Sequence, residues 1–211
     1  MQEFVEVEKN DFVIFFLTFT TIGNILIAIV KFIFSITTLS LWFGVNMGFT
    51  IVLSLARIFS IRDYGKMRII KDKEIKRKIG YKNYLNNGIL LIILGIMYFF
   101  VSVYMYYEGT TTNMHEYLTY LVAFIAFWSI GSAIYGMVKY KKDHSPILKA
   151  VKITNFANAM TSIVLTQVVL LDTYAKEYDL ANVNGYTGMS VSLIIMILGL
   201  YMIISISKNL I

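Results

Sequence analysis

The chain has 211 residues, of which 57% are hydrophobic and 15% are charged, and its formal net charge is +6. An average soluble domain has about 25% charged residues, so this composition points away from an ordinary water-soluble fold. The absence of cysteine excludes disulfides, thiolate metal sites and cysteine nucleophiles.

Six apolar segments follow one another along the chain, and each has about the 20 residues that a helix needs to cross a bilayer. They cover residues 12–35, 39–60, 87–107, 118–139, 152–172 and 187–207. We therefore expect an all-α fold, an integral membrane bundle of six transmembrane helices. It should form a single domain over residues 1–211 with no soluble C-terminal domain. The acidic residues 1–11 lack the positive region of a secretory signal, so we expect the first segment to be retained.

Lysine and arginine are concentrated in two of the connecting segments, residues 61–86 and 140–151, and Arg57 stands at the helix end that precedes the first of them. The segments at 108–117 and 173–186 contain almost none, with Lys176 as the exception. Because basic loops stay on the cytoplasmic side, an even number of spans places both termini in the cytoplasm. The high content of Ile, Lys, Asn and Tyr is typical of a bacterial source, so we expect a protein of the bacterial plasma membrane.

Residues 63–84 combine many cations with interleaved apolar side chains, a pattern typical of a basic helix lying on the inner leaflet. Such a helix would contact anionic lipid head groups, and the cations concerned are Lys71, Lys73, Lys76, Arg77 and Lys78. The alternative is that these charges only fix the topology. We expect no nucleic-acid partner, because no soluble recognition element accompanies the cations.

Aspartate, glutamate and histidine are nearly absent from the six apolar segments. Asp172 stands at the end of the fifth, and both histidines, His115 and His144, lie between segments. Proton-coupled pumps and intramembrane hydrolases need carboxylates, imidazoles or activated nucleophiles inside the bundle. The sequence therefore predicts no enzyme, no cofactor and no metal site.

Uncharged polar residues remain inside the segments, together with Lys31 in the first. The candidates for lining a pathway are Asn46, Thr50, Thr154, Asn155 and Asn158. Spacings of three and four residues place Thr154, Asn155 and Asn158 toward one side of a helix. Such side chains either hydrogen-bond to neighbouring helices or line a narrow cavity, and the sequence leaves both readings open.

Three stretches resemble the cation diffusion facilitator family. They are NILIAIVK at 24–31, SLWFGVN at 40–46 and AVKITNFANAMTSIVL at 150–165, which look like that family's first helical hairpin and fifth span. The resemblance implies metal ligands on spans two and five, at positions that fall on Phe49, Leu53, Thr154 and Asn158. A second register of the hairpin gives Asn46 and Thr50 instead. Neither register offers a carboxylate or an imidazole, so a zinc site is not expected.

Two functions follow as alternatives. The first is a transporter-like protein on a facilitator scaffold that moves a solute other than zinc, for which neutral oxygens would hold a hard cation only weakly. The second is a non-transporting membrane scaffold, regulatory subunit or partner subunit. The expected partners are the lipid bilayer and its anionic head groups, and homodimerisation is left open.

Overall fold

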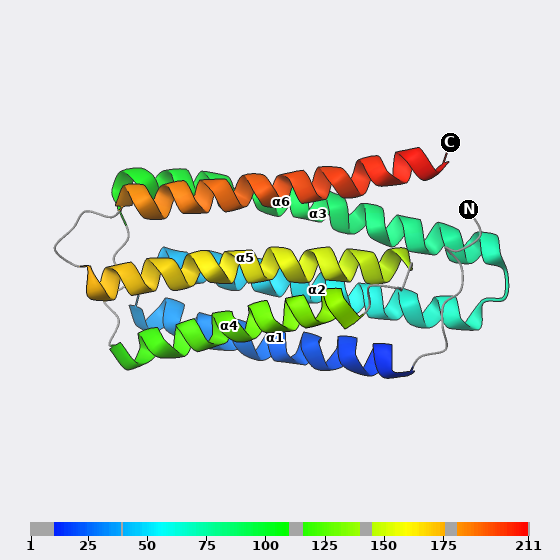
Figure 1. Cartoon of the computed structure of the whole chain (residues 1–211), viewed down its shortest axis with the longest axis horizontal. Coiled ribbons are helices and arrows are strands. Elements are labelled where there is room, and N and C mark those ends of the chain that lie inside the picture. Colours follow the sequence, from blue (N-terminus) through cyan, green and yellow to red (C-terminus); the bar gives the residue numbers. More distant parts are fainter. Residues whose placement is uncertain (1–10, 39, 110–115, 140–144, 176–180, 211) are drawn as a thin grey trace.

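The computed structural model describes residues 11–38, 40–109, 116–139, 145–175 and 181–210. These residues form six helices and no strand: α1 (Asp11–Thr38), α2 (Leu41–Ile69), α3 (Lys73–Glu108), α4 (Glu116–Lys139), α5 (Pro146–Tyr174) and α6 (Ala181–Leu210). All six are long and apolar enough to cross a membrane. The expected all-α bundle of six membrane-spanning helices is confirmed (Figure 1). The chain is an integral membrane protein.

Several helices extend well beyond the predicted spans. α2 continues to Ile69, nine residues past the predicted end at 60, and α3 begins at Lys73, not at 87. The early start of α3 has a local cause, because the side chain of Asp72 accepts hydrogen bonds from the backbone N–H groups of Glu74 and Ile75. This is an N-cap, which satisfies donors that the first turn of a helix leaves free. The apolar run alone does not reveal it.

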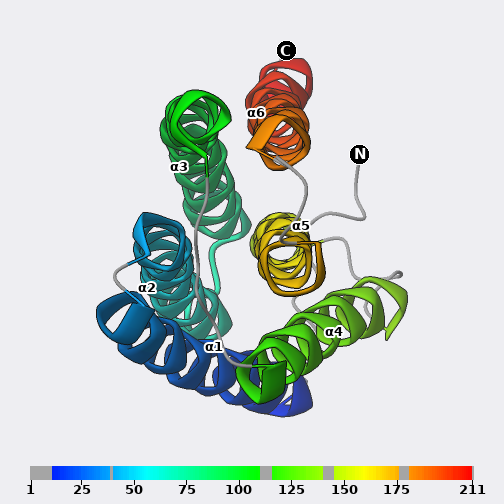
Figure 2. The ribbon, with the colours of Figure 1, turned by 90° about the vertical axis from the view of Figure 1, so that its left-hand side faces the viewer.

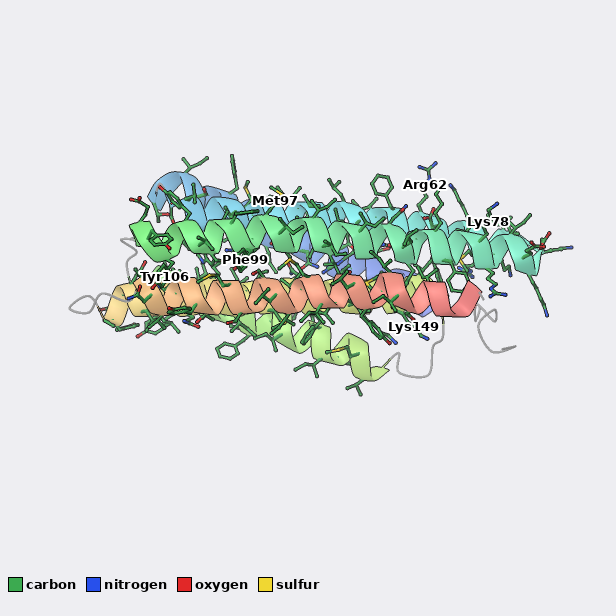
Figure 3. The ribbon with its side chains drawn as sticks, turned by 90° about the horizontal axis from the view of Figure 1, so that it is seen from above. Arg62, Lys78, Met97, Phe99, Tyr106 and Lys149 are labelled. Atoms are coloured by element: carbon green, nitrogen blue, oxygen red, sulfur yellow. The ribbon has the colours of Figure 1, made fainter. Side chains whose placement is uncertain are left out.

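The basic segment therefore does not form the separate helix that the sequence suggested. Its first part is the end of α2 and its second part is the beginning of α3, with a break at 70–72. Lys71, Lys73, Arg77 and Lys78 are exposed, and Lys76 is half-exposed. Figure 3 shows Arg62, Lys78 and Lys149 toward one end of the bundle and Tyr106 at the other. We call the first the basic end and the second the tyrosine end.

The helices pack as three antiparallel pairs, α1 with α2, α4 with α5 and α3 with α6. In the end-on view of Figure 2, α5 lies between α4 and α6 and faces α2 and α3. It contacts all four of these helices and is the most enclosed of the six. Large apolar side chains on the outward faces remain exposed, as lipid-facing surfaces require. The lining of any internal site must therefore come mainly from α5 and the helices that face it.

Glycines allow α3 and α6 to approach each other most closely. A Cβ atom placed on Gly199 of α6 would lie 2.7 Å from the carbonyl oxygen of Gly88 on α3. Gly95 and Gly188 meet the opposite helix in the same way. Lipid tails are as apolar as the side chains of the helices, so the hydrophobic effect does not drive helices together inside a bilayer. Small residues favour association there because they let two backbones pack closely. This pair forms one closely packed side of the bundle.

Candidate functional site

The inward face of α2 carries a row of buried polar side chains. Asn46, Thr50, Ser54, Arg57 and Ser60 are all buried, and their spacing of three or four residues keeps them on one broad face. Most of their side-chain hydrogen-bond donors are used within the helix itself. The Thr50 hydroxyl donates to the Asn46 carbonyl at 2.8 Å, and Ser54 donates to the Thr50 carbonyl at 2.8 Å. The row thus presents mainly oxygen lone pairs and one guanidinium to the bundle interior.

Lys31 of α1 reaches into this row from the side. Its side chain is 3% exposed, and its Nζ donates to the Thr50 hydroxyl at 3.0 Å. Beside it is a cavity of about 10 Å³ whose walls include Phe43, Ser162 and Leu165. A cavity of that size holds about one water molecule. The ammonium group therefore sits in an enclosed place between α1, α2, α4 and α5.

Arg57 is the second buried cation, also 3% exposed. Its Nε and Nη1 atoms are fully buried and have no hydrogen-bond partner. Among the described residues, neither Arg57 nor Lys31 has a carboxylate partner. The nearest carboxylate along α2 is Asp63, six residues further on, and its Oδ2 accepts from the Asn83 amide at 2.9 Å. The bundle interior thus holds two cationic side chains without a compensating negative charge.

The packing of α2 against α5 sets Arg57 level with Asn158. One apolar cluster joins the two helices near the basic end, and its members include Tyr64, Met67, Ile147, Leu148 and Val151. Arg57 precedes Tyr64 by seven residues and Asn158 follows Val151 by seven, so each lies about 10 Å from the cluster toward the tyrosine end. A step of seven residues also returns to nearly the same helix face. Arg57 and Asn158 therefore occupy facing positions on antiparallel helices.

The polar residues of α5 are mostly buried inside the bundle, and Ser162 lines the small cavity beside Lys31. Thr154, Asn158, Thr161 and Ser162 are at most 3% exposed, whereas Asn155 is half-buried. The three hydroxyl groups donate to carbonyl oxygens of their own helix at 3.0 Å. In contrast, the side-chain oxygens of Asn155 and Asn158 are buried without a partner. The same is true of Asn46 on α2.

The structure places the polar candidates predicted from the sequence on α2 and α5, two helices that contact each other. Phe49 and Leu53, at the positions implied by the family resemblance, belong instead to the apolar core. The Phe49 ring packs against the Tyr98 ring of α3 at 5.8 Å, within the apolar cluster that α2, α3 and α5 share. No group of three potential metal-ligating side chains is found in the described part of the chain. His115 and His144 lie outside the described residues.

A second polar cluster, which the sequence analysis missed, joins α2 and α3 near the basic end. The Asn83 side-chain oxygen accepts from Ser60 at 3.0 Å and from Asn87 at 3.1 Å, while its amide donates to Asp63. A cavity of about 410 Å³ borders this network, with Asn86 also in its wall. The four-residue spacing of Asn83 and Asn87 was a usable signal, but the predicted span began only at 87. The hydrogen bonds are mutually satisfied, so this cluster acts first as a link between the two helices.

The anionic-lipid candidates lie apart from the polar face. They occupy the basic end: Lys71 lies in the break between α2 and α3, and the others lie on the part of α3 that precedes its apolar stretch. The Arg77 guanidinium lies 5.3 Å from the centre of the Tyr81 ring, a cation–π arrangement that holds this charge close to the helix. The lysines Lys141, Lys142 and Lys176 lie outside the described residues.

Comparison of the chain with protein-family models, curated proteins and solved structures finds no match. Its function must therefore be argued from its own residues.

Proposed function

We propose that this protein is transporter-like, that the polar face between α1, α2 and α5 binds its solute, and that this solute is neither zinc nor another divalent cation. The carrying observation is the set of buried polar groups that have no partner: Arg57 and the amide oxygens of Asn46 and Asn158. Such groups are costly inside a bilayer and usually mark a pathway or a site.

The charge of this face argues against a cationic solute. Zinc sites need carboxylate, imidazole or thiolate ligands, and the polar face contains only neutral oxygens and two cations. Lys31 and Arg57 would repel a divalent cation at any position between them. A hard alkali or alkaline-earth cation is disfavoured for the same reason.

The resemblance to the cation diffusion facilitator family supports a transport role in a different way. That family binds its substrate between spans two and five, and in this protein α2 and α5 pack against each other and both carry buried polar side chains. The support is for the place of the site, not for its chemistry. Fold-level likeness is an analogy and carries no substrate.

Cysteine accessibility tests this proposal, and the chain has no native cysteine to interfere. In reconstituted vesicles, Asn158→Cys should react with a small water-soluble thiol reagent. Val164→Cys is the matched control, because Val164 is equally buried on the same helix but belongs to the apolar core. Reaction at 158 but not at 164 supports a pathway that water can reach. Lack of reaction at both positions contradicts it.

The second candidate function is a scaffold, regulatory subunit or partner subunit without transport. Phe49 and Leu53 favour it, because apolar packing fills the positions at which the resemblance implies ligands. Introducing Phe49→Asp, Leu53→Asp, Thr154→His and Asn158→Asp together and measuring zinc flux separates the fold from its chemistry. Gain of flux would show that a pathway survives around these positions, and no gain in a folded variant favours the scaffold.

We also propose that the basic end lies in the cytoplasm of a bacterial plasma membrane, where its exposed cations contact anionic head groups. The support is the positive-inside rule, together with the position of Arg62, Lys78 and Lys149 toward one end (Figure 3). Glu74→Cys and Glu116→Cys should then be labelled from opposite sides of the membrane. Labelling of both from the same side would overturn this orientation.

A further inference from the structure

We infer that the solute of the polar face is a small anion, with Arg57 as its principal ligand and Lys31 as a second cation nearer the tyrosine end. This inference rests on the proposed function, because it requires the polar face to be reachable from water. It is carried by the burial of two cations in one polar face without a carboxylate among the described residues.

The first step of the argument is the energetic position of Arg57. Its guanidinium remains charged under all ordinary conditions, so burial cannot be relieved by loss of a proton. A buried charge is tolerated when a counter-charge or a dense set of hydrogen bonds compensates it. Two of its three nitrogen atoms have neither. An anion placed against them would supply both the charge and the acceptors.

The second step is that the protein does not supply this anion itself. Asp63 is the nearest carboxylate on α2, but a step of six residues turns it about 120° around the helix from Arg57. Asp63 is also engaged by Asn83 in the cluster that faces α3. The position level with Arg57 on α5 holds Asn158, which is buried and uncharged.

The third step concerns what surrounds the guanidinium. Asn158 carries an amide N–H₂ group that can donate to an anion, and its oxygen has no partner to hold it in its present orientation. An amide of this kind can rotate to present its donor when an anion binds. A planar guanidinium together with one amide donor suits a carboxylate or a halide. The confined space beside Lys31, about 10 Å³, favours a small one.

Lys31 adds a second cation along the same path. Its Nζ is held at Thr50, seven residues from Arg57 on α2, so the two positions are separated by about 10 Å along the helix axis. Thr50, Ser54 and Ser162 lie around the stretch between them. Two successive cations that each bind an anion with moderate affinity suit the passage of that anion, because each position must bind it and also release it.

The test uses Asn158→Cys in vesicles, with two thiol reagents of similar size, one bearing a sulfonate and one a quaternary ammonium group. We expect the ratio of the sulfonate rate to the ammonium rate to be at least tenfold higher at position 158 than for a free thiol in solution. The reason is that the charge of Arg57 makes the local electrostatic potential positive. Chloride or acetate, replacing gluconate at constant ionic strength, should slow the reaction at least threefold. Both effects should disappear in Arg57→Gln and persist in Arg57→Lys.

The outcomes separate the two proposals. If position 158 reacts with neither reagent, the polar face is closed to water and the proposed function fails together with this inference. If it reacts with both reagents but neither chloride nor acetate protects it, the face is a water-filled path that does not bind a small anion, and only the inference fails. Faster reaction of the ammonium reagent would also overturn it. Arg57→Lys shows that a folded protein with the charge restored recovers the behaviour.

Discussion

Replacing Lys31 by methionine should make the protein more stable, although it removes a hydrogen bond. The side chain is 3% exposed, and its only hydrogen bond among the described residues is the 3.0 Å contact from Nζ to the Thr50 hydroxyl. A lysine inside a bilayer helix costs about 2.5–3.5 kcal/mol on insertion scales. The hydrogen bond returns about 0.5–1.5 kcal/mol. Methionine keeps the length and the flexibility of the chain without the charge.

The difference predicts a gain of about 1–3 kcal/mol for Lys31→Met. Thr50 is not left with an unused donor, because its hydroxyl already donates to the Asn46 carbonyl at 2.8 Å. For a chain of this length 1 kcal/mol shifts the melting temperature by about 2–4 °C, so Tm should rise by roughly 2–12 °C. Thermal unfolding in detergent measures this, with the fluorescence of the buried Trp42 as the signal. Lys78→Met, at an exposed position, is the control and should leave Tm within about 2 °C.

A fall in Tm for Lys31→Met would refute this reasoning. It would mean that Lys31 contributes more to folding through its contacts than its burial costs, and hence that it is a structural residue. A rise in Tm combined with loss of anion protection at position 158 would be the pattern of a residue kept for function. The measurement thus bears on the role of Lys31 as well as on its energy.

Two further predictions concern the helix contacts. Gly199→Ala should lower the free energy of unfolding by about 1–3 kcal/mol, because its new Cβ would lie 2.7 Å from the Gly88 carbonyl oxygen. Gly131→Ala is the control and should leave the stability unchanged, because nothing lies within 4 Å of its new Cβ. Equal stabilities of the two variants in a denaturant titration would disprove the close α3–α6 contact. Asn83→Ala should lower the free energy of unfolding by about 1–3 kcal/mol, because Ser60, Asp63 and Asn87 each lose a hydrogen bond. Asn86→Ala, at an exposed position, is the control and should be neutral. A neutral Asn83→Ala in the same titration would rule out the network.

The number and kind of the helices could be predicted because lipid imposes a simple rule. Within the described residues, each of the six apolar segments corresponds to one helix, and none is divided between two. In hydrocarbon every backbone polar group must be satisfied within the segment, so a long apolar run has hardly any alternative to a helix. Pro146 also fits, because it stands at the first position of α5, where a missing N–H does no harm.

The helix ends were predicted less well, since apolarity reports only the part of a helix that lies in hydrocarbon. α3 starts fourteen residues before its predicted span because Asp72 caps it and because its charged first turns are helical in their own right. Nothing in the hydropathy of residues 73–86 distinguishes such an extension from a helix lying on the membrane surface. The pairing of α3 with α6 was equally hidden, since close approach of glycines becomes visible only when the partner helix is known.

The same error in a boundary concealed the most informative residue of the site. With the second span ending at 60, Arg57 was read as one more cation at a helix end, where arginines commonly fix topology. The structure continues α2 by nine residues and places Tyr64 and Met67 in a buried cluster beyond it, so Arg57 lies inside the bundle and level with Asn158. Whether an arginine fixes topology or takes part in a site depends on how deep it lies in the bundle, and its residue type alone does not show this. The depth of Arg57 depends on the packing of α2 against α5. The sequence of one apolar segment by itself therefore could not distinguish a topology role from a role in the site.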